Sequence, residues 1–293
     1  MAASLLLLAF VTALLGGGVA LASRQLGAPA RPTPAVRLQA VRRRTLRWRQ
    51  AGVLAGVAAS AAAVALGDTL GRGLMLAAPL FALSVLLGVI AGELGVPAPG
   101  GPSRQVPLEV RRMRDYLPQP LVGAVTAAAA LLASLLAVTT LSGSADDMGR
   151  AGRQLVRDCA GGVTSAVGPW PGSFYSLPLA LVLLVGAGAT LLALRRIVQR
   201  PRQGENLALD DLLRRQAAAG VTAAAGLLVA VPLAGVSGVT AIALLGHVCD
   251  PGWFAVAGTG LALVVPTMVA LAGWCVVRLL ATSAGADDAR AGA

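Results

Sequence analysis

The residues best suited to chemistry surround two cysteines, Cys159 and Cys249, which both fall in polar segments between apolar stretches. Two thiols in an oxidising compartment form a disulfide when their Cα atoms lie within about 7 Å of each other. Asp158, His247 and Asp250 are neighbours of these cysteines in the sequence, so a metal site is the alternative. Because no C-x-x-C or H-E-x-x-H spacing supports a metal ion, we predict a disulfide between Cys159 and Cys249 and no metal site.

A second group of residues suggests an interrupted helix. Proline removes a helical hydrogen bond and can bend the helix, and transporters build mid-membrane binding sites at such interruptions. The residues that we assign to a cavity or a kink lie in the last two apolar stretches and are Pro232, Gly235, Ser237, Gly238 and Pro266. The alternative is a tilted helix with a kink, whose glycines serve close packing.

Arginine clusters form a third candidate site. All basic residues are Arg, and similar segments such as VRLQAVRRRTLRWRQ and VPLEVRRMRDYLPQP combine an Arg cluster with apolar residues. Whether these segments begin three true repeats stays open. Such a surface binds anionic lipid or a partner protein. The residues that we assign to it are Arg42, Arg43, Arg44, Arg111, Arg112, Arg214 and Arg215.

Motifs for other chemistry are missing from the sequence. It has no G-x-x-x-x-G-K-[ST] phosphate loop, no G-x-S-x-G motif and no ionisable residue in the middle of an apolar stretch. Glu93 comes closest, but Gly95 and Pro97 place it at the end of its stretch. Proton-coupled transporters usually need an intramembrane ionisable relay. Proton coupling and enzymatic activity are therefore disfavoured, and we predict no cofactor.

The elements that must position these residues are long apolar helices. Of 293 residues, 56% are hydrophobic and 13% are charged, and the mean hydropathy is +0.76. About 20 apolar residues are needed for a helix to cross a hydrocarbon core of about 30 Å. The sequence predicts an all-α, polytopic membrane helix bundle in a single domain. Its seven transmembrane helices are expected at 4–22, 51–67, 74–92, 121–141, 177–194, 217–246 and 254–280.

The distribution of Arg predicts the orientation of the bundle. Twenty arginines lie on one side of the seven spans and four on the other, and cytoplasmic loops carry the excess of positive charge. The N-terminus is therefore expected outside and the C-terminus inside. Residues 142–176 would form an external loop that begins with a short helix at 146–158. Residues 281–293 would form a disordered cytoplasmic tail. A cleaved signal peptide is the alternative for the first span, but no basic residue precedes it.

The chain resembles uncharacterised multi-pass integral membrane proteins of high-GC Gram-positive bacteria. The resemblance rests on the all-Arg basic set, the spans rich in Ala, Leu, Val and Gly, and motifs such as EVRRMRDYLP at 109–118. It implies a multi-pass protein of the bacterial plasma membrane and transfers no catalytic residue. Because the arginines are spread over several loops beside the spans, the partners we expect are the lipid bilayer and a membrane or cytoplasmic protein, not nucleic acid.

Two functions remain from the sequence. The first is a transport or permease-like component, favoured by proline-containing spans and small loops. The alternative is a non-transporting scaffold or accessory subunit that binds a partner or anionic lipid through its Arg-rich cytoplasmic face.

Overall fold

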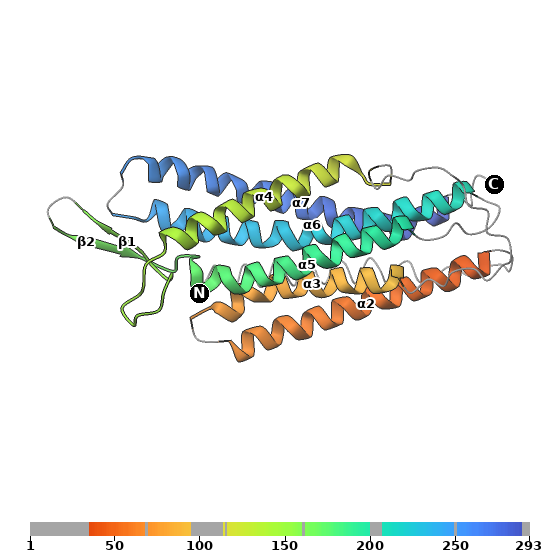
Figure 1. The fold of residues 1–293 in the computed structure, drawn as a ribbon, viewed down its shortest axis with the longest axis horizontal. Helices are drawn as coiled ribbons and strands as arrows, with labels where there is room; N and C mark the ends of the chain where they lie inside the picture. The colour runs from red at the N-terminus through yellow and green to blue at the C-terminus, as the bar shows by residue number, and fades with distance from the viewer. Residues whose placement is uncertain are drawn as a thin grey trace.

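The structure is a computed structural model that describes residues 35–67, 70–94, 114, 116–159, 162–199, 207–248 and 251–288. Within these residues, six helices are long and apolar enough to cross a membrane (Figure 1). They are α2 (Ala35–Leu66), α3 (Arg72–Leu94), α4 (Gln119–Ser142), α5 (Ser173–Gln199), α6 (Leu207–Leu245) and α7 (Trp253–Asp288). Each helix contains one of the predicted spans, except that α2 and α6 each end one residue before their predicted span does. The first predicted span, 4–22, lies outside the described residues.

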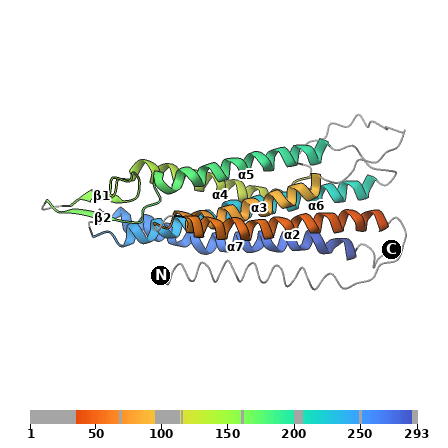
Figure 2. The ribbon, with the colours of Figure 1, turned by 90° about the horizontal axis from the view of Figure 1, so that it is seen from below.

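Helix α6 is the centre of the bundle. It packs against α3, α4, α5 and α7, whereas α2 packs mainly against α3 (Figures 1 and 2). In the apolar 18-residue stretch of α6, 56% of the residues are buried, compared with 11% in α2 and at most 33% in the other helices. The apolar surface of the outer helices therefore faces outward, as expected for helices whose surroundings are lipid.

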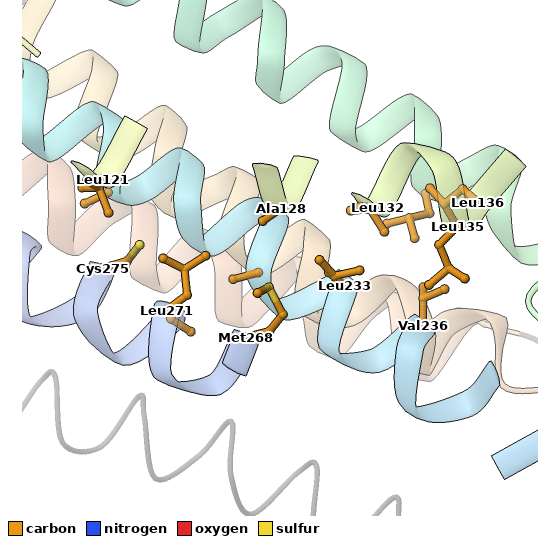
Figure 3. Packing of buried hydrophobic residues seen from close by; sticks show 14 residues of the cluster. Leu121, Ala128, Leu132, Leu135, Leu136, Leu233, Val236, Met268, Leu271 and Cys275 are labelled. Atoms are coloured by element: carbon orange, nitrogen blue, oxygen red, sulfur yellow. The ribbon is translucent and has the colours of Figure 1, made fainter. Parts of the chain in front are cut away.

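Two apolar clusters on α6 hold the helices together. The first lies between α4, α6 and α7 and includes Leu132, Leu233 and Met268 (Figure 3). The second joins α3, α5 and α6 and includes Leu86 and Val221, both fully buried. The core thus extends along α6 and consists mainly of aliphatic side chains.

Two G-x-x-x-G motifs bring α2 and α3 into backbone contact. Gly52 and Gly56 lie on α2, and Gly88 and Gly92 lie on α3. A Cβ atom added to Gly88 would lie 2.7 Å from the Cα of Gly52 and 2.7 Å from the carbonyl oxygen of Trp48. Small residues allow this approach, which is how helices associate in lipid.

A β-hairpin replaces the helix expected at 146–158. Strands β1 (Leu155–Asp158) and β2 (Thr164–Val167) pair antiparallel and project beyond the ends of the helices (Figure 1). Gly149 and Gly152 have φ angles of +76° and +75°, which a right-handed helix does not contain. The predicted helical bundle is confirmed for the six described helices, but the all-α fold class missed this small sheet.

Three helices extend beyond their apolar spans. Helix α2 begins at Ala35 instead of 51, α6 begins at Leu207 instead of 217, and α7 continues to Asp288. The backbone of residues 281–288 is therefore helical, which differs from the disordered tail expected at 281–293. The added segments are rich in Ala, Leu and Arg, which favour helices.

We expect the substitution Gly88→Ile to destabilise the protein, because the added side chain has no space between α2 and α3. Overpacking of this kind costs about 1–3 kcal/mol. The matched control is Gly188→Ile on α5, where Gly188 is exposed and an added Cβ meets no atom within 4 Å. The measurement is the Tm of purified protein in detergent, and equal Tm values for the two variants would contradict the role of the glycine contact.

Candidate functional site

Asp146 is the centre of a polar network in the loop between α4 and α5. Its carboxylate accepts hydrogen bonds from the backbone N–H groups of Met148 at 3.1 Å and Arg150 at 2.9 Å. It also accepts hydrogen bonds from Nε of Arg150 at 2.8 Å and Nη1 of Arg153 at 2.5 Å. The Asp146 side chain is only 2% exposed, so these donors replace water around the anion. We call this loop, residues 143–172, the cap.

These contacts determine the pKa of Asp146. Burial alone would raise the pKa, but the hydrogen bonds from Arg150, Arg153 and Met148 stabilise the anion and lower the pKa from 3.8 to about 2. A carboxyl group with a lowered pKa contributes stability above its unfolded pKa, and this contribution is lost as the pH falls through its folded pKa. The network is therefore complete at neutral pH and is lost between pH 3.8 and about 2.

Trp170 joins the cap to three helices. Its indole Nε1 donates a hydrogen bond to the carbonyl oxygen of Thr139 on α4 at 2.8 Å. The Trp170 ring is 3% exposed and packs in a small cluster with Leu155 of β1 and with the adjoining ends of α6 and α7, including Leu244 and Phe254. The base of the hairpin is therefore part of the folded core and not a separate flap.

The first turn of α5 fixes the cap to the turn between α2 and α3. The guanidinium groups of Arg72 and Arg153 lie 5.0 and 5.4 Å from the ring centre of Phe174, within the range of a cation–π contact. The hydroxyl group of Tyr175 donates a hydrogen bond to the carbonyl oxygen of Leu70 at 2.8 Å. The cap therefore contacts the turn between α2 and α3 as well as α4, α5, α6 and α7. We call this end of the bundle the hairpin end.

The cysteines lie at different ends of the bundle. Cys159 directly follows β1, where its N–H donates to the carbonyl oxygen of Val163 at 2.8 Å. Cys275 is a free, buried thiol in the C-terminal half of α7, whereas Cys159 is not a free thiol. Cys249 and Asp250 lie outside the described residues.

The residues of the alternative metal site have other contacts. Asp158 accepts a hydrogen bond from the Thr164 hydroxyl at 3.0 Å across the hairpin. His247 is 5% exposed, and its ring meets the Phe254 ring edge-on at 5.3 Å between centres. Within the described part of the chain, no three His, Cys, Asp or Glu residues are grouped as a metal site would need.

At the end opposite the hairpin, Arg49 connects three helices. Its Nη2 atom lies 3.5 Å from Oε1 of Glu93 on α3, and its Nη1 atom donates to the carbonyl oxygen of Leu279 on α7 at 3.3 Å. Glu93, the acid closest to an apolar span, thus forms an ion pair at the end of the bundle. It has a structural role there.

The structure corrects the assignment of Arg214 to a lipid or partner surface. Arg214 is 3% exposed, and its Nη1 atom donates to the carbonyl oxygens of Ile197 at 3.3 Å and Val198 at 3.2 Å. These carbonyls belong to the last turn of α5, where no helical N–H is available to them. Arg214 therefore caps α5, whereas the adjacent Arg215 is exposed.

Other predicted surface arginines are exposed where the structure describes them. Arg43 and Arg44 are exposed on the first half of α2, close to Arg47 and to Trp48, which is 44% exposed. The side chain of Arg42, and Arg111 and Arg112 as a whole, lie outside the described residues.

The structure does not bring the predicted cavity residues together. Helix α6 is continuous through Pro232, which is buried with Ser237 in the packed core. Pro266 on α7 is exposed on the outer surface of the bundle. The rotation of α7 turns Pro266 away from α6, and the assignment of these residues to a cavity or a kink stays a prediction.

Sequence reasoning missed the cap network. The signal was present in the segment DDMGRAGR at 146–153, where turn-forming Asp and Gly alternate with Arg. The long-range part had no local signal, because the partner of Trp170 is 31 positions away.

Comparison with protein-family models, curated proteins and solved structures found no match to this chain. The class of protein is therefore defined by the fold alone. It is a bundle of apolar helices compatible with a multi-pass integral membrane protein, with a polar cap at one end.

We expect Asp146→Asn to loosen the cap at neutral pH, because the uncharged amide cannot accept all four hydrogen bonds from its N–H donors. The wild-type protein should show the same change only as the pH approaches 2. The measurement is hydrogen exchange of peptides from the cap, with Asp147→Asn, at an exposed neighbouring position, as the control. Identical exchange in both variants at pH 7 would show that the network does not hold the cap.

Proposed function

We propose that the protein is a non-transporting scaffold or accessory subunit of a bacterial plasma-membrane complex. The observation that carries this proposal is the cap, which holds a β-hairpin beyond the bundle while its base is anchored by Asp146 and Trp170. A hairpin on a fixed base is suited to recognition, because it loses little conformational freedom on binding. Its two strands also have unpaired edges in the described structure, and a partner strand can add to an edge.

The orientation that we propose places the hairpin end outside and the opposite end in the cytoplasm. Described arginines at the opposite end include Arg43, Arg44, Arg215 and Arg278, all exposed. At the hairpin end, the positive charge of Arg150 and Arg153 is partly neutralised by Asp146. Arg72 and Arg157 are exposed at the hairpin end, so most but not all of the exposed positive charge lies at the opposite end, in keeping with the excess on the cytoplasmic side of membrane proteins.

The arginine-rich end offers a second binding surface. Arg47 comes four residues after Arg43 and three after Arg44, so its side chain neighbours both of theirs on the surface of α2. With the adjacent, partly exposed Trp48 they match the composition of a site for anionic headgroups at the membrane boundary. A scaffold with this surface would be held by lipid on one side and bind its partner on the other.

A transport or permease-like component is the competing function. One observation favours it: the Ser237 hydroxyl on α6 is fully buried, and within the described residues its oxygen has no hydrogen-bond partner. Against it, α6 is an unbroken helix at Pro232 and is packed by aliphatic side chains. A substrate would have to separate these side chains in order to reach Ser237.

We also propose that Cys159 forms a disulfide with Cys249. Cys275 lies in the inner half of α7, far along the helix from the hairpin, which leaves Cys249 as the remaining cysteine of the chain. In the sequence, Cys249 comes four residues after the last residue of α6, Leu245. The Leu244 side chain near the end of α6 packs against the base of the hairpin. The bond would tie the hairpin to the turn between α6 and α7, which limits its movement further.

The disulfide and the orientation are tested together by thiol labelling of intact cells. We expect a membrane-impermeant maleimide to label Cys159 and Cys249 only after treatment with an impermeant reductant. In a Cys159→Ser variant, Cys249 should be labelled without reductant, because its partner is gone. Labelling of both cysteines without reductant would exclude the bond, and labelling that requires broken cells would place the hairpin in the cytoplasm.

The function is tested by the composition of the complex in native membranes. We expect Val163→Asp and Ala166→Asp, at exposed hairpin positions, to lose a membrane partner that copurifies with the wild-type protein after cross-linking. The control is Met148→Asp, at a position that is 72% exposed in the cap but outside the hairpin. Quantitative mass spectrometry of the purified complex is the measurement.

A second pair of variants separates the two functions. Pro232→Ala and Ser237→Ala should leave the copurified partner unchanged if the protein is a scaffold. If the hairpin variants retain every partner while these core variants abolish a solute flux across membrane vesicles, the scaffold proposal is wrong and the transport function is supported.

A further inference from the structure

Helix α2 has two faces of small residues, and the described helices cover only one of them. The first face contains Gly52 and Gly56, which contact α3. The second consists of alanines that are all exposed, separated by four, three, four and three residues. They are Ala51, Ala55, Ala58, Ala62 and Ala65, and we call them the alanine seam.

The spacing of the alanine seam is that of a helix–helix contact. Steps of four and three residues keep side chains on one face along several turns. Lipid alone does not require small side chains, and the exposed surface beside the seam carries the larger residues Leu54, Val57 and Val64. Alanine at every position of one face allows a neighbouring helix to approach closely, which is the main source of helix association in a bilayer.

The same chain contains a segment with the complementary spacing. Residues 4–22 are apolar except for Ser4 and Thr12, and Ala9, Ala13, Gly16 and Ala20 are separated by four, three and four positions. Read in the opposite direction, this is the spacing of the first four alanines of the seam. An antiparallel pair in one register therefore places small residues opposite one another at four successive levels: Ala20 with Ala51, Gly16 with Ala55, Ala13 with Ala58 and Ala9 with Ala62.

The length of the connection allows this register. Helix α2 begins at Ala35, 16 residues before Ala51. With Ala20 opposite Ala51, the chain must therefore continue about 24 Å along the helix axis before α2 begins. A lateral step of about 8–10 Å to a neighbouring helix must be added. The 12 residues from 23 to 34, between the two helices, reach about 40 Å when extended, which is sufficient. The connection also makes the antiparallel direction the natural one, because it joins the two segments at the same end of the bundle.

We propose that residues 4–22 form a helix that packs antiparallel to α2 on the alanine seam. Helix α2 then lies between this segment on one face and α3 on the other. This packing gives the most exposed of the described helices a second neighbour, and it places the N-terminus at the hairpin end. The inference does not depend on what the cap binds.

The proposal is tested by disulfide cross-linking of the full chain in native membranes. The test variant combines Ala13→Cys with Ala58→Cys in a Cys275→Ala background, with a protease site inserted between Arg31 and Pro32. After mild oxidation and cleavage, we expect the N-terminal fragment to remain attached to the rest of the chain on a non-reducing gel. The control combines Ala13→Cys with Val57→Cys, because Val57 is exposed but points about 100° away from Ala58.

The difference between the two pairs decides the proposal. We expect the Ala58 pair to retain the fragment on the order of tenfold more than the Val57 pair, since disulfide formation requires close Cβ atoms. Equal retention, or none in either pair, would overturn the proposal. A cross-linked dimer of Ala58→Cys alone would also overturn it, because a second copy of the chain would then occupy the alanine seam.

Discussion

Close contact between helix backbones is the interaction on which this bundle depends. In a bilayer, a leucine moved from lipid to another helix leaves no water behind, so burial itself stabilises association little. Contact between small residues replaces it. The Cα atoms of Gly52 and Gly88 meet in this way between α2 and α3, and a Cβ added to Gly226 of α6 would lie 2.5 Å from Sγ of Cys275 on α7. These three glycines therefore determine how closely α2 approaches α3 and α6 approaches α7.

The same apolar surroundings place the charged groups at the two ends. Along the helices, buried hydroxyl groups such as those of Thr139, Thr222 and Thr240 donate to a carbonyl oxygen of the preceding turn, so they leave no donor exposed to lipid. At the ends, Asp146 and Arg214 are buried with polar partners. A charge that is buried without such partners costs several kcal/mol. The ends therefore hold the only rigid polar structure that the described residues offer for recognition.

The sequence predicted the six described spans well and the polar contacts of the site poorly, for a physical reason. A span is defined by length and apolarity, both of which are local and are set by the thickness of the bilayer. The site depends on helix rotation, which is a property of the packing. Arg214 is buried and Arg215 is exposed although they are adjacent, and Pro266 faces outward while Pro232 faces the core. The Trp170 contact with Thr139 joins residues from opposite ends of a loop, where local patterns carry no information.

The position of small residues is the one local signal that does report on packing. Helix α6 is the helix with four neighbours, and its buried positions include Ala218, Ala224 and Ala230, which are almost wholly covered. Small side chains are needed there because several helices converge on one axis. Helix α2 is richer in alanine over 51–66 than α6 is, but has α3 as its main neighbour among the described helices. Because alanine in α6 lies where neighbouring helices approach closely, the alanine content of α2 is that of a helix with close neighbours on two faces.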